Sequence, residues 1–178
     1  ARRLGLPFAE LDLRGDFARQ VQDYFVAEYF RGRTPNPCVV CDQAIKFGRL
    51  WREVSGWGGS RLATGHYARI KKGSQGSLGL YRVVDRGKDQ SYFLCRLPRE
   101  LLPHLDFPLG EFTKTQVRQI YLELGIPLAD DYRESQEVCF IPQGRYQEFL
   151  RLRRGSLGPP GDLVDTGGRL LGRHRGLA

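Results

Sequence analysis

The sequence predicts an α/β fold, because segments with strand character alternate with segments that carry a helical pattern. Residues 8–12 have the pattern of a short strand, and Asp16 is placed to cap a helix over residues 17–30. Residues 61–64 have the pattern of a buried strand end, and the turn at residues 65–67 follows it. In open α/β sheets, ligands bind at the carboxyl ends of strands. We therefore expect a ligand near this turn.

A proline-rich loop with two cysteines follows the first predicted helix, which Gly32 is expected to end. Two prolines fix their own φ and push the preceding residues toward extended geometry, which predicts a stiff, extended loop over residues 34–38. This loop would present the C-x-x-C pair of Cys38 and Cys41. Asp42 is then predicted to cap a second helix.

The middle of the chain predicts a loop, a strand and a helix. A Gly/Ser/Lys-rich loop over residues 71–78 leads into a strand predicted for residues 78–84. Thr113 begins a capping box, and the helix after it should end at Gly125. The side chains expected to face inward from this helix are those of Val117, Ile120 and Leu124.

The character of the sequence changes near residue 143. A basic helix is predicted over residues 145–153, and residues 162–171 have the pattern of a β-hairpin. We interpret this region as the start of a second, β-rich domain. The predicted division is therefore residues 1–142 for the α/β part and residues 143–178 for the second.

Composition narrows the class of protein without deciding the function. The net charge is +8, and 23 of the 28 basic residues are arginine. A basic balance favours a polyanionic partner such as nucleic acid, although a compositional bias toward arginine explains it equally well. No apolar run approaches the roughly 18 residues of a membrane span, and no signal-peptide pattern opens the chain, so we expect a cytoplasmic protein. Since methionine is absent, we expect a piece of a longer protein.

Four cysteines in such a chain indicate metal binding, redox chemistry or nucleophilic catalysis rather than a disulfide scaffold. A structural zinc site would need a second ligand pair at short spacing, but Cys95 and Cys139 are single and far apart. Three cysteines around an iron–sulfur cluster remain an alternative. A redox C-x-x-C normally opens a helix after a strand, whereas a Pro-Asn-Pro loop precedes Cys38.

Other candidate residues allow both a structural and a functional interpretation. Apolar neighbours favour core burial for Cys95 and, less strongly, for Cys139. The polar cluster at residues 88–91 could bind phosphate, ribose or base edges, or form a solvated turn. His66 could contact a phosphate or base, or be structural. Positive charge near the C-x-x-C pair, from Arg33 and Lys46, would lower a thiol pKa.

The order of motifs along the chain is more specific than any one of them. Together they closely resemble the tRNA-specific 2-thiouridylases, the MnmA/TrmU family, over essentially the whole chain. The motifs that carry the resemblance are Gly-Arg-Thr-Pro-Asn-Pro at residues 32–37, Cys41, Ile-Lys-Phe at 45–47, Ala-Thr-Gly-His-Tyr at 63–67, Lys-Asp-Gln-Ser-Tyr-Phe-Leu at 88–94, Pro-Leu-Gly at 108–110, and Val-Cys-Phe-Ile at 138–141.

The resemblance implies a fold and an activity. Residues 1–142 would be the C-terminal part of a Rossmann-like domain of the PP-loop ATPase (adenine nucleotide alpha hydrolase) type, and residues 143–178 the start of a small β-rich central domain. The family uses ATP with Mg²⁺ to adenylate the 2-carbonyl of the wobble uridine in tRNA. A protein-bound sulfur, delivered by a cysteine desulfurase or a sulfur-relay protein, then displaces AMP, so the enzyme is a sulfurtransferase.

Site residues follow from the motifs that match. Cys41 resembles the family's nucleophile, and Cys139 resembles the cysteine that carries the persulfide. Gly65 matches an ATP-contacting glycine. The residues that match the loop contacting the target base are Asn36, Pro37 and Cys38, and those that match tRNA contacts are His66, Lys88, Asp89 and Gln90.

Two departures from the family pattern matter. Many members carry aspartate where this chain has Cys38, so Cys38, Cys41 and Cys139 form a three-thiol set that could carry a persulfide or hold an iron–sulfur cluster. The family's phosphate loop, of the Ser-Gly-Gly-x-Asp-Ser type, and most of its C-terminal barrel do not occur in these 178 residues. We therefore expect this chain alone to be inactive. The rival functions are a metal- or cluster-bearing nucleic-acid-binding module and a thiol oxidoreductase.

Overall fold

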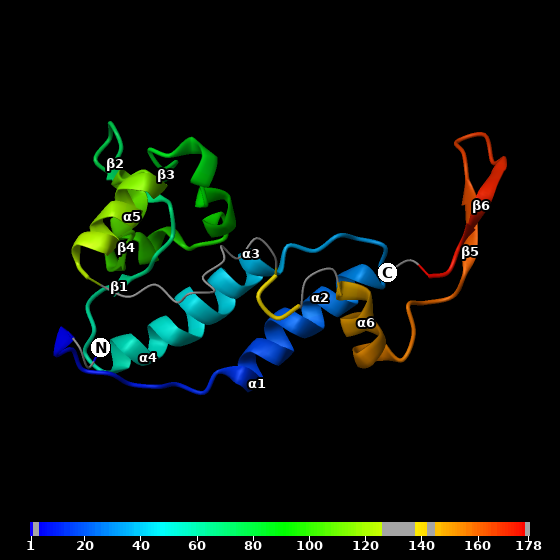
Figure 1. Ribbon diagram of the computed structural model, residues 1–178, viewed down its shortest axis with the longest axis horizontal. Helices are drawn as coiled ribbons and strands as arrows, with labels where there is room; N and C mark the ends of the chain where they lie inside the picture. Colours follow the sequence, from blue (N-terminus) through cyan, green and yellow to red (C-terminus); the bar gives the residue numbers. More distant parts are fainter. Residues whose placement is uncertain (2–3, 126–137, 142–144, 177–178) are drawn as a thin grey trace.

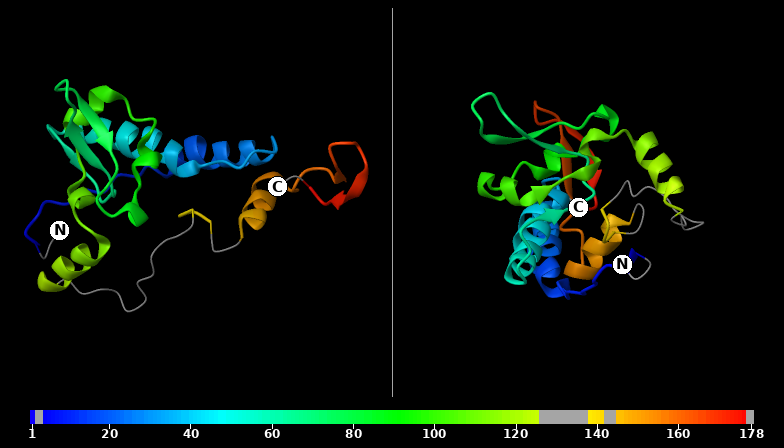
Figure 2. Two further views of the ribbon diagram at one scale, coloured as in Figure 1. Left: turned by 90° about the horizontal axis from the view of Figure 1, so that it is seen from above. Right: turned by 90° about the vertical axis from the view of Figure 1, so that its left-hand side faces the viewer.

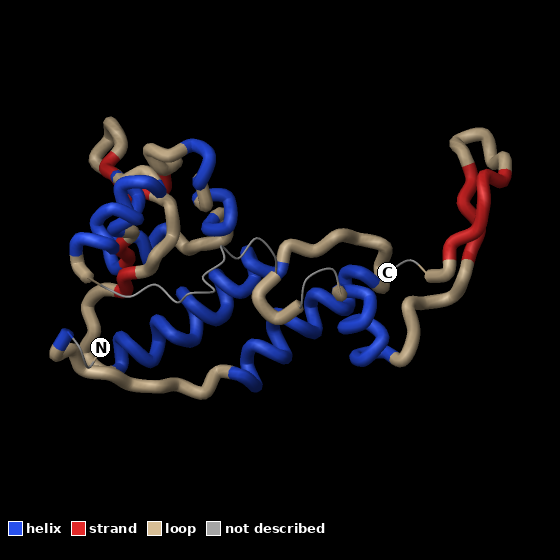
Figure 3. Tube along the Cα trace, in the orientation of Figure 1, coloured by secondary structure: helices blue, strands red, loops and turns tan. Residues whose placement is uncertain are grey.

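The structure, a computed structural model, describes residues 1, 4–125, 138–141 and 145–176. These residues form helices and three two-stranded sheets joined by loops, which confirms the predicted α/β class. Two long helical stretches run along the lower side of the molecule, and two of the small sheets lie above one end of them (Figures 1 and 3).

The first helical stretch combines α1 (Arg14–Phe17), a π-helical segment (Ala18–Gln22) and α2 (Asp23–Tyr29) without a break. It begins earlier than predicted, so Asp16 lies inside the first turn and does not cap the helix. An acidic side chain is also favourable in the first turn, where it faces the positive end of the helix dipole. Asp16 forms an ion pair with Arg19, at 2.5 Å.

The second helical stretch combines α3 (Pro37–Cys41), a π-helical segment (Asp42–Leu50) and α4 (Trp51–Gly56). Asn36 caps it, and its side-chain oxygen accepts a hydrogen bond from the N–H three residues later, at 3.4 Å. The prediction that Asp42 caps this helix is therefore wrong, as is that of an extended loop reaching Cys38. Proline at the first helical position loses no hydrogen bond and has the helical φ, so the helix begins at Pro37.

β1 (Leu62–Ala63) pairs in parallel with β4 (Leu105–Asp106), which confirms the strand predicted before the turn at residues 65–67. Residues 8–12, in contrast, are not a strand. A strand needs a neighbour for its backbone N–H and C=O groups, and no described strand pairs with these residues. Phe8 is accordingly 77% exposed.

β2 (Arg69–Lys72) and β3 (Leu78–Tyr81) form an antiparallel hairpin, and β3 is shorter than the predicted strand. Short 3₁₀ helices follow at Arg86–Lys88, Ser91–Leu94, Arg99–His104 and Pro108–Glu111. One core joins this unit to the second helical stretch. Its buried members are Phe47, Ala68, Leu94, Leu105 and Phe107.

α5 (Lys114–Glu123) begins with the predicted capping box, in which Thr113 and Gln116 exchange side-chain to backbone hydrogen bonds. Gly125 follows the helix with φ +58°, as expected of a helix-ending glycine. The prediction of an inward apolar face is wrong for two of its three residues. Ile120 and Leu124 are 39% and 66% exposed, and no residue of α5 is buried.

α6 (Tyr146–Arg154) confirms the predicted basic helix and packs on α2. β5 (Gly161–Val164) and β6 (Leu170–His174) form the predicted antiparallel hairpin, which lies apart from the other sheets (Figures 1 and 2). The buried residues of the second core are Phe25, Val26, Ile141 and Leu150. Among the described helices, none is both long and apolar enough to cross a membrane.

Candidate thiol site

Two of the four cysteines lie on the first helical turns after the Asn36 cap. Cys38 and Cys41 are both half-buried on α3, and all four cysteines of the chain carry free thiols. The C-x-x-C pair therefore opens a helix, as redox pairs do, but a loop and not a strand precedes this helix.

Cys139 reaches the same region from a distant part of the sequence. Its neighbour Phe140 packs edge-to-face against Phe17 and Phe25, with ring centroids 5.5 Å apart in both pairs. α3 contacts the π-helical segment Ala18–Gln22 of the same helical stretch. Two of the three thiols of the predicted set are thus carried by α3 and the third by a turn, and both elements pack against one helix.

Burial controls the state of the two helix thiols. It raises the pKa of Cys41 to about 11, while the ammonium of Lys46 lowers it by less and the nearby Asp42 raises it further. Burial also raises the pKa of Cys38, and the charge of Cys139 contributes in the same direction to both. The prediction of a lowered thiol pKa is therefore wrong.

Arg33 and Lys46 were the two cations expected to lower the thiol pKa, and their positions explain why it is raised instead. The guanidinium of Arg33 turns away to form an ion pair with Glu28 at 2.6 Å, and Lys46 alone does not outweigh burial. Redox C-x-x-C pairs depend on a lowered thiol pKa, so the raised values speak against a thiol oxidoreductase.

A buried carboxylate lies beneath the thiols. Asp42 is 1% exposed, and its Oδ1 is 2.7 Å from the Nζ of Lys46 one helical turn later. The Nε2 of His66 is 3.3 Å from both of these atoms, and its Nδ1 is 2.7 Å from the hydroxyl of Thr64. His66 is itself buried, so this network joins the helix to the turn after β1.

Sequence reasoning missed the role of Asp42. Its spacing of four residues from Lys46 is the signal that could have revealed the ion pair. The described geometry favours a structural role for His66. Its ring nitrogens face protein groups, and its ring packs between Phe47 and Phe107.

Asp89 and Gln90 are bound to the backbone of neighbouring segments. Oδ1 of Asp89 accepts hydrogen bonds from the N–H groups of Val83 and Ser91, at 3.3 and 3.4 Å, and Oδ2 accepts one from the Ser91 hydroxyl. Oε1 of Gln90 accepts a hydrogen bond from the N–H of Tyr67 at 2.9 Å. Gln90 thus fixes the turn at residues 65–67, and Asp89 ties residue 83 to the start of the 3₁₀ helix at residues 91–94, so the two side chains do not form a solvated turn.

Gly65 follows the carboxyl end of β1 and is exposed. A Cβ added there would meet only the side chain of Leu109, at 3.8 Å. The space in front of this glycine is therefore open to a ligand. Lys88 is half-buried. The predicted burial of Cys95 is wrong, and so is the core interpretation of Cys139, because both residues are exposed.

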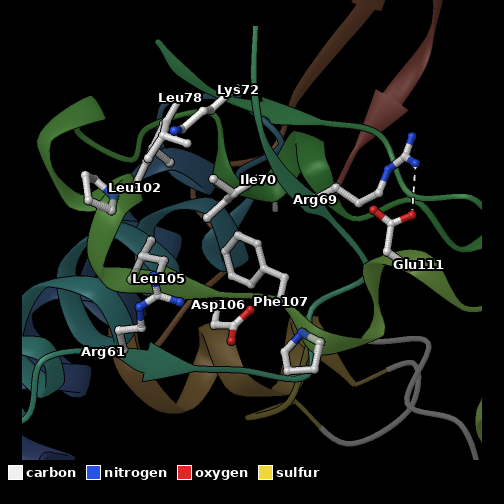
Figure 4. A pocket seen from close by; sticks show the side chains of 12 residues that line it. Arg61, Arg69, Ile70, Lys72, Leu78, Leu102, Leu105, Asp106, Phe107 and Glu111 are labelled. Carbon is white, nitrogen blue, oxygen red and sulfur yellow. Dashed lines mark hydrogen bonds and ion pairs between the residues drawn. The ribbon is translucent and has the colours of Figure 1, made fainter. Parts of the chain in front are cut away.

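A pocket of about 460 Å³ lies beside β1 and β4 (Figure 4), and no cysteine lines it. Apolar side chains such as Ile70 and Phe107 form part of its wall, and Arg69 and Glu111 form an ion pair at its edge, 3.3 Å apart. None of the predicted site residues lines it.

In the described structure, the three thiols do not form a metal-ion site. Cys38, Cys41 and Cys139 all belong to the described part of the chain, and no group of three or more His, Cys, Asp or Glu side chains there could hold a metal ion.

With this geometry in place, the relatives of the chain are informative. The sequence profile described as "tRNA methyl transferase HUP domain" matches residues 1–143. The chain belongs to this family. The match covers most of the chain, including the helix that carries the C-x-x-C pair and the turn that carries Cys139.

Curated relatives confirm the resemblance to the MnmA/TrmU family. The "tRNA-specific 2-thiouridylase MnmA" of Carboxydothermus hydrogenoformans is 49% identical over 177 residues, which are 99% of this chain and 48% of the relative. The protein with the same description from Geobacter metallireducens is 48% identical over 176 residues, again 99% of this chain and 48% of the relative. The chain thus spans about half the length of these family members.

Proposed function

We propose that this chain is part of an ATP-dependent sulfurtransferase that replaces the 2-oxygen of the wobble uridine in tRNA with sulfur. The observation that carries the proposal is the thiol site: two free cysteines on α3 and a third on a turn against the same helical stretch. The descriptions of the curated relatives support the same activity.

The proposed reaction begins with activation of the uracil 2-carbonyl. Its oxygen attacks the α-phosphorus of ATP, pyrophosphate leaves, and the oxygen becomes part of an AMP leaving group. ATP, with Mg²⁺, would lie near Gly65, where the exposed glycine at the carboxyl end of β1 leaves room for a ligand. The phosphate-binding loop is not among these 178 residues, so the chain alone should not catalyse this step.

The second half of the reaction uses the thiols. The terminal sulfur of a Cys139 persulfide attacks C2, the C2–O bond breaks, and AMP leaves with the electron pair. The Cys41 thiol then attacks the inner sulfur of Cys139 and loses its proton, which N3 of the released 2-thiouridine gains, so the transferred sulfur stays on C2 and a Cys41–Cys139 disulfide forms. A dithiol reductant must reduce this disulfide before the next cycle.

The exposure of the thiols fits this division of roles. Cys139 is exposed, so a cysteine desulfurase or a sulfur-relay protein could load it. Cys41 is half-buried and mostly protonated at neutral pH, which protects it from adventitious oxidation. We propose the persulfide route, because the exposed Cys139 can receive sulfur from a donor protein.

The base-contacting and tRNA-contacting roles of the remaining motif residues are part of the same proposal. Asn36 and Cys38 would contact the target base, and Lys88 would contact the tRNA directly. Pro37 is buried, so it would act by starting the helix that carries the thiols. His66 and Gln90 would act by holding the turn at residues 65–67, and Asp89 by holding the segment before Tyr92, since protein groups occupy their side chains. We further propose a domain division between residues 142 and 143, and a cytoplasmic location because the proposed substrate is tRNA.

A cysteine series tests the proposal. Full-length protein would be supplied with unmodified tRNA, ATP, Mg²⁺, a desulfurase and a dithiol reductant, and the wobble nucleoside analysed by mass spectrometry. Cys41→Ser and Cys139→Ser should abolish 2-thiouridine, whereas the control Cys95→Ser, also an exposed cysteine in the wild type, should leave it unchanged. Unchanged thiolation in both site variants would refute the proposal. Stoichiometric iron after anaerobic reconstitution would refute the persulfide route alone.

A further inference from the structure

An exposed tyrosine lies beside the thiol site. Tyr92 belongs to the 3₁₀ helix Ser91–Leu94, which contacts α3, the helix that carries Cys38 and Cys41. Its side chain is 55% exposed. Burial and the nearby charges of Cys38 and Asp89 raise the pKa of the phenol, which agrees with its position at the edge of the site.

The ring of Tyr92 is held in place from within the protein. Phe93 packs against it, with ring centroids 4.0 Å apart and ring planes at 37°. Leu94 anchors the same short helix in the core and is only 1% exposed. The hydrogen bonds between Asp89 and Ser91 fix the start of this helix. More than half of the tyrosine side chain is nevertheless free for contact.

Other exposed aromatic side chains lie on elements that do not carry the site. Tyr81 is 40% exposed on β3, and Trp57 is 57% exposed directly after α4, at the opposite end of its helix from the thiols. Tyr92 therefore differs from these residues in lying next to α3, and not in how exposed it is.

We propose that Tyr92 is the stacking surface for the target pyrimidine while the thiols act on it. This inference rests on the proposed function. A base that leaves its own stack to reach an enzyme loses stacking energy, and proteins commonly replace that energy with an aromatic side chain. A rigid ring at the edge of the site, with an exposed surface, suits this role and would hold C2 near the cysteines.

The experiment uses full-length protein and an anticodon stem-loop RNA with pyrrolo-cytosine, a fluorescent pyrimidine that is quenched by stacking, at the wobble position. Tyr92→Leu should weaken binding by about tenfold, the loss expected for one base–aromatic stack, and should remove the quenching. Tyr92→Phe should retain both, because it keeps the ring. Tyr81→Leu is the matched control and should behave as the wild type.

Each outcome bears on the inference. Unchanged affinity and quenching in Tyr92→Leu would overturn it, while thiolation by the wild type would leave the proposed function standing. If the wild type binds no stem-loop RNA, both are wrong. If leucine prevents folding, Tyr92→Trp decides, since a larger ring should quench at least as strongly as Tyr92→Phe. Weaker quenching by tryptophan than by phenylalanine would overturn the stacking role.

Discussion

The ion pair beneath the thiols gives a sharp stability prediction. Lys46→Met removes the ammonium 2.7 Å from the carboxylate of Asp42 and leaves that carboxylate buried without its cation. Breaking a buried pair by removing one partner typically costs about 3–5 kcal/mol. The Lys46 side chain is 44% exposed, so water can enter once it is gone, and we expect a loss below this range, about 2–3 kcal/mol.

A second lysine provides a matched control. The Lys71 side chain is also 44% exposed, and its Nζ is 2.9 Å from Glu111, but the carboxylate of Glu111 is at the surface, 56% exposed. Lys71→Met should therefore change stability far less than Lys46→Met. Glu111 also keeps its ion pair with Arg69, so the two variants differ both in the burial of the carboxylate and in whether it retains a cation.

Equilibrium urea unfolding, followed by far-ultraviolet circular dichroism, measures these differences as shifts in midpoint at constant slope. The double variant Asp42→Asn with Lys46→Met should be more stable than Lys46→Met alone, because no charge is then left buried. If Lys46→Met and Lys71→Met lose the same stability, or the double variant recovers none, the reasoning from burial is refuted.

Three further changes have outcomes that the structure specifies. Gly110→Ala should prevent stable folding, because the new Cβ would lie 2.0 Å from the carbonyl oxygen of Ala68. The control Gly56→Ala should be tolerated, because there is open space around that position. Equal thermal unfolding temperatures for the two variants would contradict the predicted clash. Leu150→Ala should cost about 2–5 kcal/mol in urea unfolding, since the side chain is fully buried between α2 and α6, and a loss below about 1 kcal/mol would contradict that packing. The rate at which iodoacetamide alkylates Cys41, followed by peptide mass spectrometry, should rise with pH with a midpoint near 11. The raised pKa of Cys41 stabilises the folded chain below about pH 9, and this contribution is lost as the pH rises to 11. A midpoint at or below the usual value of 9.0 would show that Lys46 outweighs burial.

Motif order could be interpreted reliably from the sequence, whereas local capping chemistry predicted one helix start of three. The capping box at Thr113 depends only on residues within one helical turn, so it was predictable. Asp16 and Asp42 are also good capping residues, but each lies inside a helix that begins earlier. At Asp42 the competing signal was Asn36 followed by proline, which is an equally local pattern and the one that the structure uses.

The errors at the candidate site have a different physical origin. The exposure of Cys95 and Cys139 depends on which side of a short turn faces the core, and apolar neighbours do not determine this. The thiol pKa of Cys41 depends on the balance between burial and one ammonium, and only the folded structure supplies the burial. The approach of Cys139 to α3 is a long-range contact, which motif resemblance suggested and which no local pattern could have predicted.

A variant of Asp89 that no longer binds RNA would not show that Asp89 touches RNA. Its carboxylate holds two backbone N–H groups, so its loss would loosen the segment that carries Tyr92 and, through Gln90, the backbone of Tyr67. A binding defect and a loss of local order would then look alike in an activity assay. Hydrogen exchange at the N–H groups of Val83 and Ser91 separates them, because only a loss of local order accelerates it.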